Sequence, residues 1–404
     1  MKAAIIGAGG EALHTIKKAH EHGLSVVALD GNPQAEGLKA ADQKFVIDIS
    51  NEDVTIETLK RERPDFVLTA PIGRYLTTIG AVNDALGLPG VSKETAVLCT
   101  DKLKFHETLS KKNLRKCHCF GIDVRAIADT DGEISEERAF QMEHSVKNEF
   151  FGLTFPAILK PRYGSGSRGI YMLADKQQLK EALCAVGREP YVLEECVAGE
   201  EYGVDGAVTK DGFFMILLRK KENTPPPSRQ AVGYFSVLPD DSFWQQVKNY
   251  MAEVIACLGL EECLLHADVI RTGQGPFVVE LSARPSGHNL HNLFTPLCTG
   301  VDMAEEYIKY RMGLPYCFEA ACTKPMMIHY FDMQGTVREV PDQNRVEMAL
   351  NVKLAAWQCN LKEGDELTNV SNGHSLMGRG FFVLEGEADS DLLVQAQRIK
   401  SLFL

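Results

Sequence analysis

The sequence predicts a multidomain protein that combines α/β and α+β architecture. Its 404 residues exceed the roughly 250–300 residues at which a single hydrophobic core stops growing. Short apolar runs alternate with helical patterns early in the chain, as in a parallel α/β layer. Beyond residue 100, strand patterns follow one another at short intervals, which is typical of antiparallel hairpins. We expect an N-terminal open parallel α/β domain over 1–98, a central domain over 99–318 and a small β-rich C-terminal domain over 319–404.

The composition predicts a folded protein with neither a nucleic-acid nor a membrane partner. Hydrophobic residues make up 45% of the chain and charged residues 24%, and the net charge of −12 provides no basic stripe for a phosphate backbone. The chain starts directly with a strand pattern, has no basic leader and contains no apolar run of about 18 residues. We therefore expect a cytoplasmic protein that acts on small molecules.

The eleven cysteines are expected to be reduced. Their number is odd, no C-x-x-C occurs, and several lie within apolar or helical patterns. Cys117-His118-Cys119 could form half of a metal site, but no second pair follows at zinc-ligand spacing.

The N-terminal domain is expected to open with a βαβ unit. Apolar runs predict strands at 2–6, 25–30, 44–47 and 66–69. An amphipathic pattern predicts a helix over 75–86, and Gly87 is placed to end it.

The remainder of the chain predicts hairpins framed by helices. Helices are expected at 101–113, 135–149, 241–258 and 389–403, and strands at 157–160, 170–173, 191–195, 201–208, 213–219 and again from 326 onward. Three consecutive prolines in 224–233 predict a long irregular loop, and long loops inside compact domains are often functional.

The first motif, Gly7-Ala8-Gly9-Gly10-Glu11-Ala12, follows a strand and fits G-x-G-x-x-A. Asp30 ends the second strand, about where a ribose-binding acid would lie. Together they indicate an NAD(P)- or FAD-dependent oxidoreductase. Tight packing between a strand and a helix is the alternative explanation of these glycines.

The second motif is a strand that ends in Lys160 and leads into a loop of small residues, Gly164 to Gly169. Small side chains let backbone N–H groups approach phosphate oxygens, and the lysine adds a point charge. The loop is not a Walker A motif, because no G-K-[ST] occurs and a strand follows. A flexible hairpin turn is the alternative.

The third motif is Tyr191 to Asp205, in which a strand carries Glu194 and Glu195 and resumes with Glu201 after a turn. A glutamate there could accept hydrogen bonds from ribose hydroxyls, while strand backbone groups pair with an adenine edge. A solvated strand edge is the alternative.

The fourth motif is a hairpin formed by HADVI from His266 and FVVELS from Phe277. If the turn centres on Gln274, Asp268 lies opposite Glu280, with Cβ atoms about 4.5–5.5 Å apart. Two close carboxylates repel unless one is protonated or a cation bridges them, and Mg²⁺ prefers oxygen ligands shared with phosphates. Ser282 lies on the same face. A charged hairpin rim is the alternative.

Taken in order, these segments resemble the ATP-grasp superfamily. Asp101-Lys102 and Lys160 resemble the family's nucleotide-binding lysines, and Gly164 to Gly169 its phosphate loop. Glu194 to Val197 resembles the strand that lines adenine, and Glu201 the ribose-binding acid. Asp268 and Glu280 resemble the paired magnesium ligands, while Ser282 stands where the family usually has Asn. The stretch ELSARPSGH, from Glu280 to His288, and GRGFFVLEGEA, from Gly378 to Ala388, are similar to segments of carboxylate-amine ligases, including amino-acid ligases and purine-pathway members.

The resemblance implies an ATP-dependent ligase that makes an acyl phosphate from a carboxylate and passes it to an amine, releasing ADP and phosphate. It implies ATP and Mg²⁺ or Mn²⁺ as cofactors, a central ATP-grasp domain with a lid at about 120–197, and a homodimer. Implied catalytic residues are Arg284 and Lys160. Implied nucleotide-binding residues are Lys102, Lys160, Gly164, Ser165, Gly166, Ser167, Glu194, Glu195, Val197 and Glu201. Implied metal ligands are Asp268, Glu280 and Ser282, and implied substrate residues are Arg284, Ser286, Gly287 and His288. The alternatives are the oxidoreductase above and a non-catalytic ATP-binding sensor.

Overall fold

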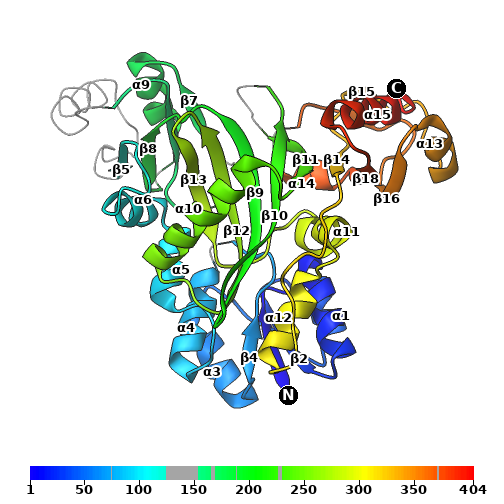
Figure 1. The fold of residues 1–404 in the computed structure, drawn as a ribbon. Coiled ribbons are helices and arrows are strands. Elements are labelled where there is room, and N and C mark those ends of the chain that lie inside the picture. Colours follow the sequence, from blue (N-terminus) through cyan, green and yellow to red (C-terminus); the bar gives the residue numbers. More distant parts are fainter. Residues whose placement is uncertain (74, 124–152, 165–168, 188, 226–229, 371–372) are drawn as a thin grey trace.

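The computed structural model describes residues 1–404 except 74, 124–152, 165–168, 188, 226–229 and 371–372. The N-terminal elements form one end of the molecule, and the C-terminal helices lie at the opposite end beside the large central sheet (Figure 1). The helix predicted over 135–149 lies outside the described residues. Within the described part, no helix has the length and apolarity needed to cross a bilayer.

The N-terminal layer is a four-stranded parallel sheet in the order β3-β2-β1-β4. Its strands are β1 (Lys2–Ile6), β2 (Ser25–Asp30), β3 (Gln43–Val46) and β4 (Phe66–Leu68). Its helices are the 3₁₀ turn Gly10–Ala12, α1 (Leu13–Glu21), α2 (Glu36–Ala40), α3 (Glu52–Glu62) and α4 (Leu76–Leu86). The prediction that Gly87 ends α4 is confirmed, since Gly87 adopts a left-handed φ of 63° there. The interior residues of β1 and β2 are buried on both faces, as expected for a covered parallel sheet.

A small antiparallel sheet of four strands, in the order β5-β8-β6-β7, follows. Its elements are β5 (Cys119–Ile122), β6 (Ala157–Pro161), β7 (Tyr171–Leu173), α9 (Lys176–Ala185) and β8 (Tyr191–Glu195). Two helices, α5 (Lys93–Thr100) and α6 (Lys102–Ser110), lead into it from the N-terminal layer. The strands predicted for this segment are confirmed to within a residue.

An eight-stranded sheet in the order β13-β12-β9-β10-β11-β14-β18-β16 forms the centre of the molecule. Its first strands are β9 (Glu200–Thr209), β10 (Gly212–Asn223), β11 (Ala231–Val237), β12 (Cys263–Thr272) and β13 (Gly275–Ser282). The helices beside them are α10 (Ser242–Leu258), a π-helix at Leu290–Phe294, α11 (Thr295–Thr299) and α12 (Met303–Arg311).

The prediction of an irregular loop over 224–233 was wrong at the C-terminal end of that range, because β11 begins at Ala231. The inner residues of β11 are buried on both faces. A strand covered on both sides shows no alternation of apolar and polar residues, so the sequence pattern did not reveal it.

The C-terminal region continues the same sheet. Its elements are β14 (Met326–Tyr330), β15 (Gly335–Thr336), α13 (Gln343–Ala349), β16 (Lys353–Cys359), β17 (Glu366–Leu367), α14 (Gly373–Met377), β18 (Gly380–Glu385) and α15 (Asp389–Ser401). Because β11 pairs with β14, the limit expected at residue 318 does not interrupt the sheet. The domain limits therefore stay a prediction.

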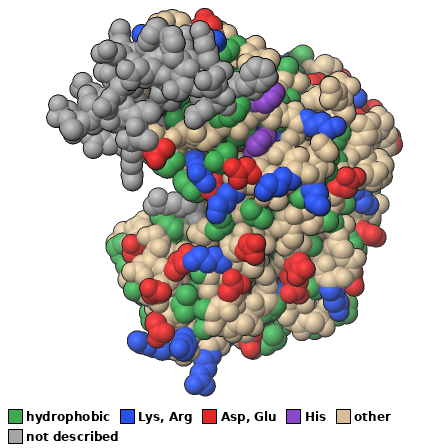
Figure 2. All heavy atoms as spheres, turned by 90° about the vertical axis from the view of Figure 1, so that its left-hand side faces the viewer, with side chains coloured by type: hydrophobic (Ala, Val, Ile, Leu, Met, Phe, Trp, Pro, Cys, Tyr) green, Lys and Arg blue, Asp and Glu red, His purple; other side chains and the backbone are tan. Residues whose placement is uncertain are grey.

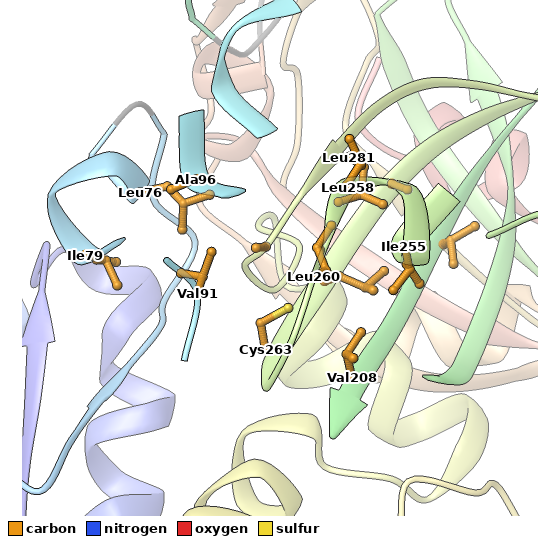
Figure 3. Packing of buried hydrophobic residues seen from close by; sticks show 14 of the residues in the cluster. Leu76, Ile79, Val91, Ala96, Val208, Ile255, Leu258, Leu260, Cys263 and Leu281 are labelled. Atoms are coloured by element: carbon orange, nitrogen blue, oxygen red, sulfur yellow. The ribbon is translucent and has the colours of Figure 1, made fainter. Parts of the chain in front are cut away.

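One hydrophobic core joins the N-terminal layer to the central sheet. Leu76 and Ile79 of α4 belong to the same buried cluster as Leu258 of α10 and Cys263 and Leu281 of the hairpin (Figure 3). The N-terminal layer therefore cannot lose its contact with the sheet without exposing apolar surface.

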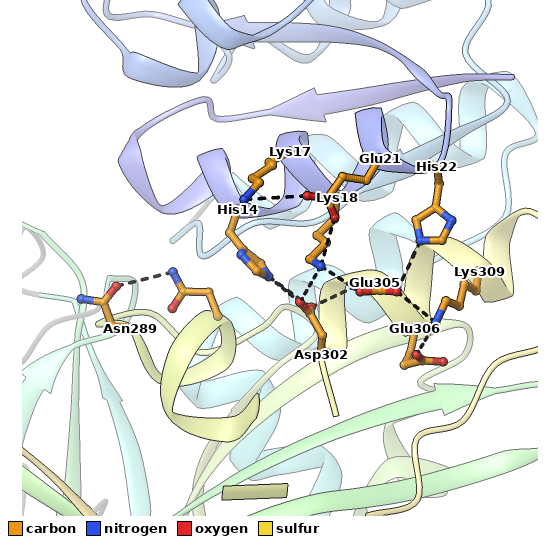
Figure 4. Close-up of polar contacts among 11 residues, drawn as sticks. His14, Lys17, Lys18, Glu21, His22, Asn289, Asp302, Glu305, Glu306 and Lys309 are labelled. Atoms are coloured by element: carbon orange, nitrogen blue, oxygen red, sulfur yellow. Dashed lines mark hydrogen bonds and ion pairs between the residues drawn. The ribbon is translucent and has the colours of Figure 1, made fainter. Parts of the chain in front are cut away.

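A second junction is polar and lies between α1 and α12 (Figure 4). Lys18 Nζ lies 2.9 Å from Glu305 Oε2, and His14 Nε2 lies 2.9 Å from Asp302 Oδ2. Single exposed pairs contribute little, but several connected pairs restrict how α1 can move against α12.

We predict that Leu258→Ala destabilises the whole molecule. Leu258 is 2% exposed, and truncating a buried leucine costs about 2–5 kcal/mol because a cavity remains. Thermal and chemical denaturation measure the loss. The control is Val394→Ala at a position that is 53% exposed, where a change below about 0.5 kcal/mol is expected. Equal effects of the two substitutions would contradict the continuous core.

Candidate active site

A hollow that is partly open to solvent lies where α6, the small sheet and the β12–β13 hairpin meet. The predicted site residues that line it are Lys102, Gly164, Glu280, Ser282 and Arg284. On the face shown in Figure 2, basic and acidic side chains lie next to one another, and no large patch carries one sign of charge. Separate segments of the sequence thus meet at one concave place, as expected of a ligand site.

The hairpin places its two acids face to face. In the antiparallel pairing of β12 and β13, Asp268 is opposite Glu280 and His266 is opposite Ser282. The predicted opposition of the acids is therefore confirmed. The predicted turn centre was wrong, because Thr272 pairs with Gly275 and a bulge next to Asp268 shifts the register by one residue. Bulges of this kind re-aim side chains and are frequent next to active sites.

Asp268 has one oxygen paired and one without a hydrogen bond. Its Oδ2 lies 2.5 Å from Lys221 Nζ, whereas its buried Oδ1 accepts no hydrogen bond and lies 3.5 Å from His266 Nε2. Burial raises the pKa of Asp268, but Lys221 and His266 outweigh burial, and the pKa is lowered overall. An ionised oxygen without a donor, facing a second carboxylate, fits a divalent cation.

Such a cation would need further oxygen ligands. Within the described residues, no group of three or more His, Cys, Asp or Glu side chains could hold a metal ion. Asp268 and Glu280 with the Ser282 hydroxyl suit Mg²⁺, which keeps water ligands and shares substrate phosphates.

The eleven cysteines form no disulfide, as predicted.

Lys160 lies in a buried ion-pair triad. Its ammonium pairs with Glu194 Oε1, and Arg115 Nη2 lies 2.8 Å from Glu194 Oε2. Burial raises the pKa of Glu194, but Lys160 and Arg115 outweigh burial and lower the pKa to about 2. Neither Lys160 nor Glu194 is among the residues that line the hollow. The positive charge of Lys160 is thus paired with a carboxylate of the protein itself, that of Glu194.

Lys102 begins α6 beside the hollow. Asp101 caps this helix through Leu103 N at 3.1 Å and also accepts from Arg162 Nε at 2.7 Å. Lys102 Nζ donates to the carbonyl oxygen of Gly164 at 2.8 Å, and burial lowers the pKa of the Lys102 ammonium. The cap and the ion pair fix the helix start, so the lysine is held against Gly164.

Of the predicted phosphate loop, Ser165, Gly166 and Ser167 lie outside the described residues. The flanking Gly164 and Gly169 have φ values of 122° and 68°. Side chains other than glycine rarely adopt such angles, which accounts for the glycines at both ends.

The other predicted nucleotide residues lie along β8 and β9. Glu195 accepts from His118 N and from Thr154 Oγ1, each at 2.8 Å, and so anchors two neighbouring segments. Val197 is half-buried in the turn after β8, and Glu201 pairs with Ile270 across β9 and β12. Their nucleotide contacts stay a prediction.

The segment after β13 carries the predicted substrate residues. Arg284 lines the hollow, and burial lowers its pKa while Glu280 and Asp268 oppose that shift. The Ser286 hydroxyl is buried and forms no hydrogen bond within the described structure. A Cβ at Gly287 would come within 3.3 Å of Glu11 Oε1. His288 N donates to the same Glu11 oxygen at 2.6 Å.

Glu11 comes from the N-terminal glycine motif, so this motif contributes to the same site. Asp30 accepts from Ala8 N at 2.7 Å and from Asn32 N at 2.8 Å. Asp30, the acid that a dinucleotide enzyme would use to bind ribose, therefore accepts hydrogen bonds from the backbone of the glycine turn and of its own turn. The glycine motif is better explained by packing against the segment after β13 than by dinucleotide binding.

Residues 153–291 match the family model of the ATP-grasp domain. These residues therefore carry an ATP-grasp domain. ATP with Mg²⁺ or Mn²⁺ is the cofactor set of ATP-grasp ligases, and a solved structure similar to this chain, an N5-carboxyaminoimidazole synthetase from Staphylococcus aureus, is a complex with ADP. The resemblance inferred from the ordered motifs is thereby confirmed.

The chain is similar over nearly its whole length to solved ligase structures. L-amino acid ligase from Bacillus licheniformis has a TM-score of 0.77 at 16% identity, covering 99% of this chain and 97% of that one. Phosphoribosylglycinamide synthetase from Anaerococcus prevotii has a TM-score of 0.72 at 20% identity, covering 99% and 98%. At these identities the likeness shows the fold, and the predicted mixed α/β multidomain class is confirmed.

Curated relatives match the chain over shorter spans. Dapdiamide A synthase of Enterobacter agglomerans is 26% identical over 148 residues, which is 33% of this chain and 34% of the relative. Formate-dependent phosphoribosylglycinamide formyltransferase of Methanocella arvoryzae is 20% identical over 342 residues, covering 80% of this chain and 75% of the relative. The chain thus spans about a third of the first relative and three quarters of the second.

Sequence reasoning missed the cations that balance the acids, chiefly Lys221, Arg219 and Arg115. Arg219 and Lys221 lie two residues apart on β10, so the alternation of a strand puts both on one face. That signal was available once β10 was placed next to β9. Arg115 lies between α6 and β5, and its ion pair with Glu194 spans 79 residues of sequence. No local pattern reveals a contact of that separation.

We predict that Glu194→Gln destabilises the fold in a pH-dependent way. With its pKa lowered to about 2, the ionised Glu194 stabilises the fold above its unfolded pKa of about 4.3, and this contribution is lost as the pH falls. The variant leaves Lys160 and Arg115 uncompensated, at a cost of about 3–5 kcal/mol near neutral pH.

Chemical denaturation at about pH 7 and about pH 3.5 tests this expectation, because the gap between variant and wild type should narrow at the lower pH. Glu363→Gln, at an exposed position, serves as the control and should change the stability little at either pH. A gap that is the same at both pH values would contradict the lowered pKa of Glu194.

Proposed function

We propose that this chain is an ADP-forming ligase that joins a carboxylate substrate to an amine through an acyl phosphate. The observation that carries the proposal is the opposition of Asp268 and Glu280, together with a hollow that Glu280, Lys102 and Arg284 line. Similarity to proteins named as an L-amino acid ligase and a phosphoribosylglycinamide synthetase supports the reaction class.

The acidic and basic residues of the site have different proposed roles. Asp268 and Glu280, with the Ser282 hydroxyl, would hold the divalent cation, and Lys102 would place a positive charge beside the phosphates. When bound, ATP would supply the phosphoryl group that the carboxylate takes up with release of ADP, the metal would neutralise phosphate charge, and an amine would then displace phosphate. Arg284 would neutralise negative charge that develops during both transfers. Phosphoryl transfer depends on positioning and charge neutralisation, so no protein nucleophile is required.

Several finer assignments belong to the same proposal. We assign nucleotide contacts to Lys102, Lys160, the Gly164 to Gly169 loop, the strand Glu194 to Val197 and Glu201. Substrate contacts are assigned to Ser286, Gly287 and His288, which follow Arg284. A cytoplasmic location and a homodimer stay predictions of the sequence.

The direct test is trapping of the acyl phosphate. The chain is incubated with ATP, Mg²⁺, hydroxylamine and a panel of amino acids and short carboxylic acids, and both hydroxamate and ADP are measured. We expect one carboxylate to give hydroxamate and ADP in equal amounts. ATP binding in calorimetry without ADP release for any mixture would instead identify a non-catalytic ATP-binding protein.

We predict that Arg284→Ala lowers turnover far more than ATP affinity. Removing a group that meets charge developing in the transition state costs about 10²–10³ in kcat. ATP affinity is measured by calorimetry and turnover by ADP release, with Arg284→Lys as the variant that keeps the charge. Equal losses of affinity and turnover would reassign Arg284 to ground-state nucleotide binding.

A further inference from the structure

We propose that Lys221 is a resident counter-ion of Asp268 that an incoming divalent cation displaces, and that its freed ammonium then neutralises the anionic substrates. The second half of this proposal rests on the proposed ligase function. The first half concerns only the chain and the cation. Lys221 would thus be a further functional residue of the site, supplied by β10 and separate from the hairpin.

The sheet brings Lys221 to Asp268 across an intervening strand. Asp268 on β12 pairs with Gly203 on β9, and Gly203 pairs with Arg219 on β10. Lys221 lies two residues beyond Arg219 and therefore on the same face. Its ammonium reaches Asp268 Oδ2 at 2.5 Å, with 9% of the Lys221 side chain and 22% of the Asp268 side chain exposed.

Gly203 makes this crossing possible. A Cβ at this position would come within 3.2 Å of Arg219 Cζ, so even alanine would crowd the guanidinium. Without a side chain at this position of β9, the long Lys221 side chain from β10 can lie over that strand and meet Asp268 on β12. The glycine thus accounts for an ion pair between two strands that are not neighbours.

The two carboxylates of this face differ in how completely they are satisfied. Both oxygens of Asp205 accept a hydrogen bond, one from Arg219 Nη2 at 2.9 Å and one from Thr295 Oγ1 at 2.9 Å, although Nε and Nη1 of the buried Arg219 donate none. Asp268 instead keeps Oδ1 without a hydrogen bond and stands opposite Glu280. Asp268 therefore has an oxygen left for a cation, whereas Asp205 has none.

The chemistry of lysine suits a displaceable role. The ammonium is a compact charge on a flexible stem, so it can leave one carboxylate and meet another anion without moving the backbone. A divalent cation between Asp268 and Glu280 repels the ammonium and replaces its attraction for Asp268. A buried cation left without a partner is costly. The carboxylate and phosphoryl groups entering the hollow would restore the balance.

Mn²⁺ binding to the nucleotide-free chain, followed by the electron paramagnetic resonance of free Mn²⁺, tests the displacement without any turnover. In Lys221→Met the competing ammonium is gone, and we expect Mn²⁺ to bind about tenfold more tightly. If the pair only holds Asp268 in place, the sign reverses and Mn²⁺ binds more weakly. Lys221→Arg keeps the charge and should bind Mn²⁺ like the wild type.

Lys220→Met is the matched control. Lys220 points to the other face and pairs with the exposed Glu200 at 2.8 Å, so its loss should leave Mn²⁺ affinity unchanged.

The second half is tested by turnover at saturating metal and ATP, where we expect Lys221→Met to lower kcat at least about tenfold despite tighter Mn²⁺ binding. Unchanged kcat would overturn the substrate role of the freed ammonium. If Lys221→Met binds Mn²⁺ more tightly but the wild-type chain shows no ligase turnover, the counter-ion role of Lys221 is retained and the proposed function is overturned. Unchanged or weaker Mn²⁺ binding in Lys221→Met would overturn the proposal itself.

Discussion

Two carboxylates of like charge face each other on the β12–β13 hairpin, and the surrounding structure is arranged to tolerate them. Asp268 and Glu280 are opposite in register because a bulge corrects the count set by the turn. Their repulsion must be offset by nearby positive charge or by a bound cation. Lys221 is paired to Asp268, while Lys102 and Arg284 lie close enough to Glu280 for its charge to oppose the lowering of their pKa values.

This arrangement requires that β9, the strand between β12 and β10, carries no side chain at Gly203. Gly203 lies between Asp268 of β12 and the cations of β10, and a larger residue would crowd Arg219. A second set of charges connects the hairpin to the small sheet, since Arg115 donates to the carbonyl oxygen of Val278 at 3.1 Å and pairs with Glu194. Arg115 thus contacts the strand of Glu280 and the carboxylate that neutralises Lys160.

The sequence was sufficient for the fold class, because strand alternation is a local rule. The opposed acids were predicted from a turn centred on Gln274, and they face each other because the bulge beside Asp268 offsets the error in that centre. It was insufficient for β11, which is buried on both faces and shows no alternation. It also did not reveal that Lys160 would be paired with Glu194, because that ion pair depends on the lateral order of β6 and β8. Lys221 could have been found by extending the face of Arg219 along β10, whereas the contact of Arg115 with Glu194 crosses 79 residues.

The N-terminal glycine motif shows why the site must be considered across the whole chain. Its resemblance to a dinucleotide turn is real in sequence, yet Asp30 holds the turn itself and Glu11 accepts from His288 N. Burial raises the pKa of Glu11, while the His288 amide and Arg284 oppose that shift. The Glu11 carboxylate therefore links the N-terminal layer to the segment that follows the β12–β13 hairpin. Because one hydrophobic core also joins these parts, the N-terminal layer and the hairpin are constrained to form the site together.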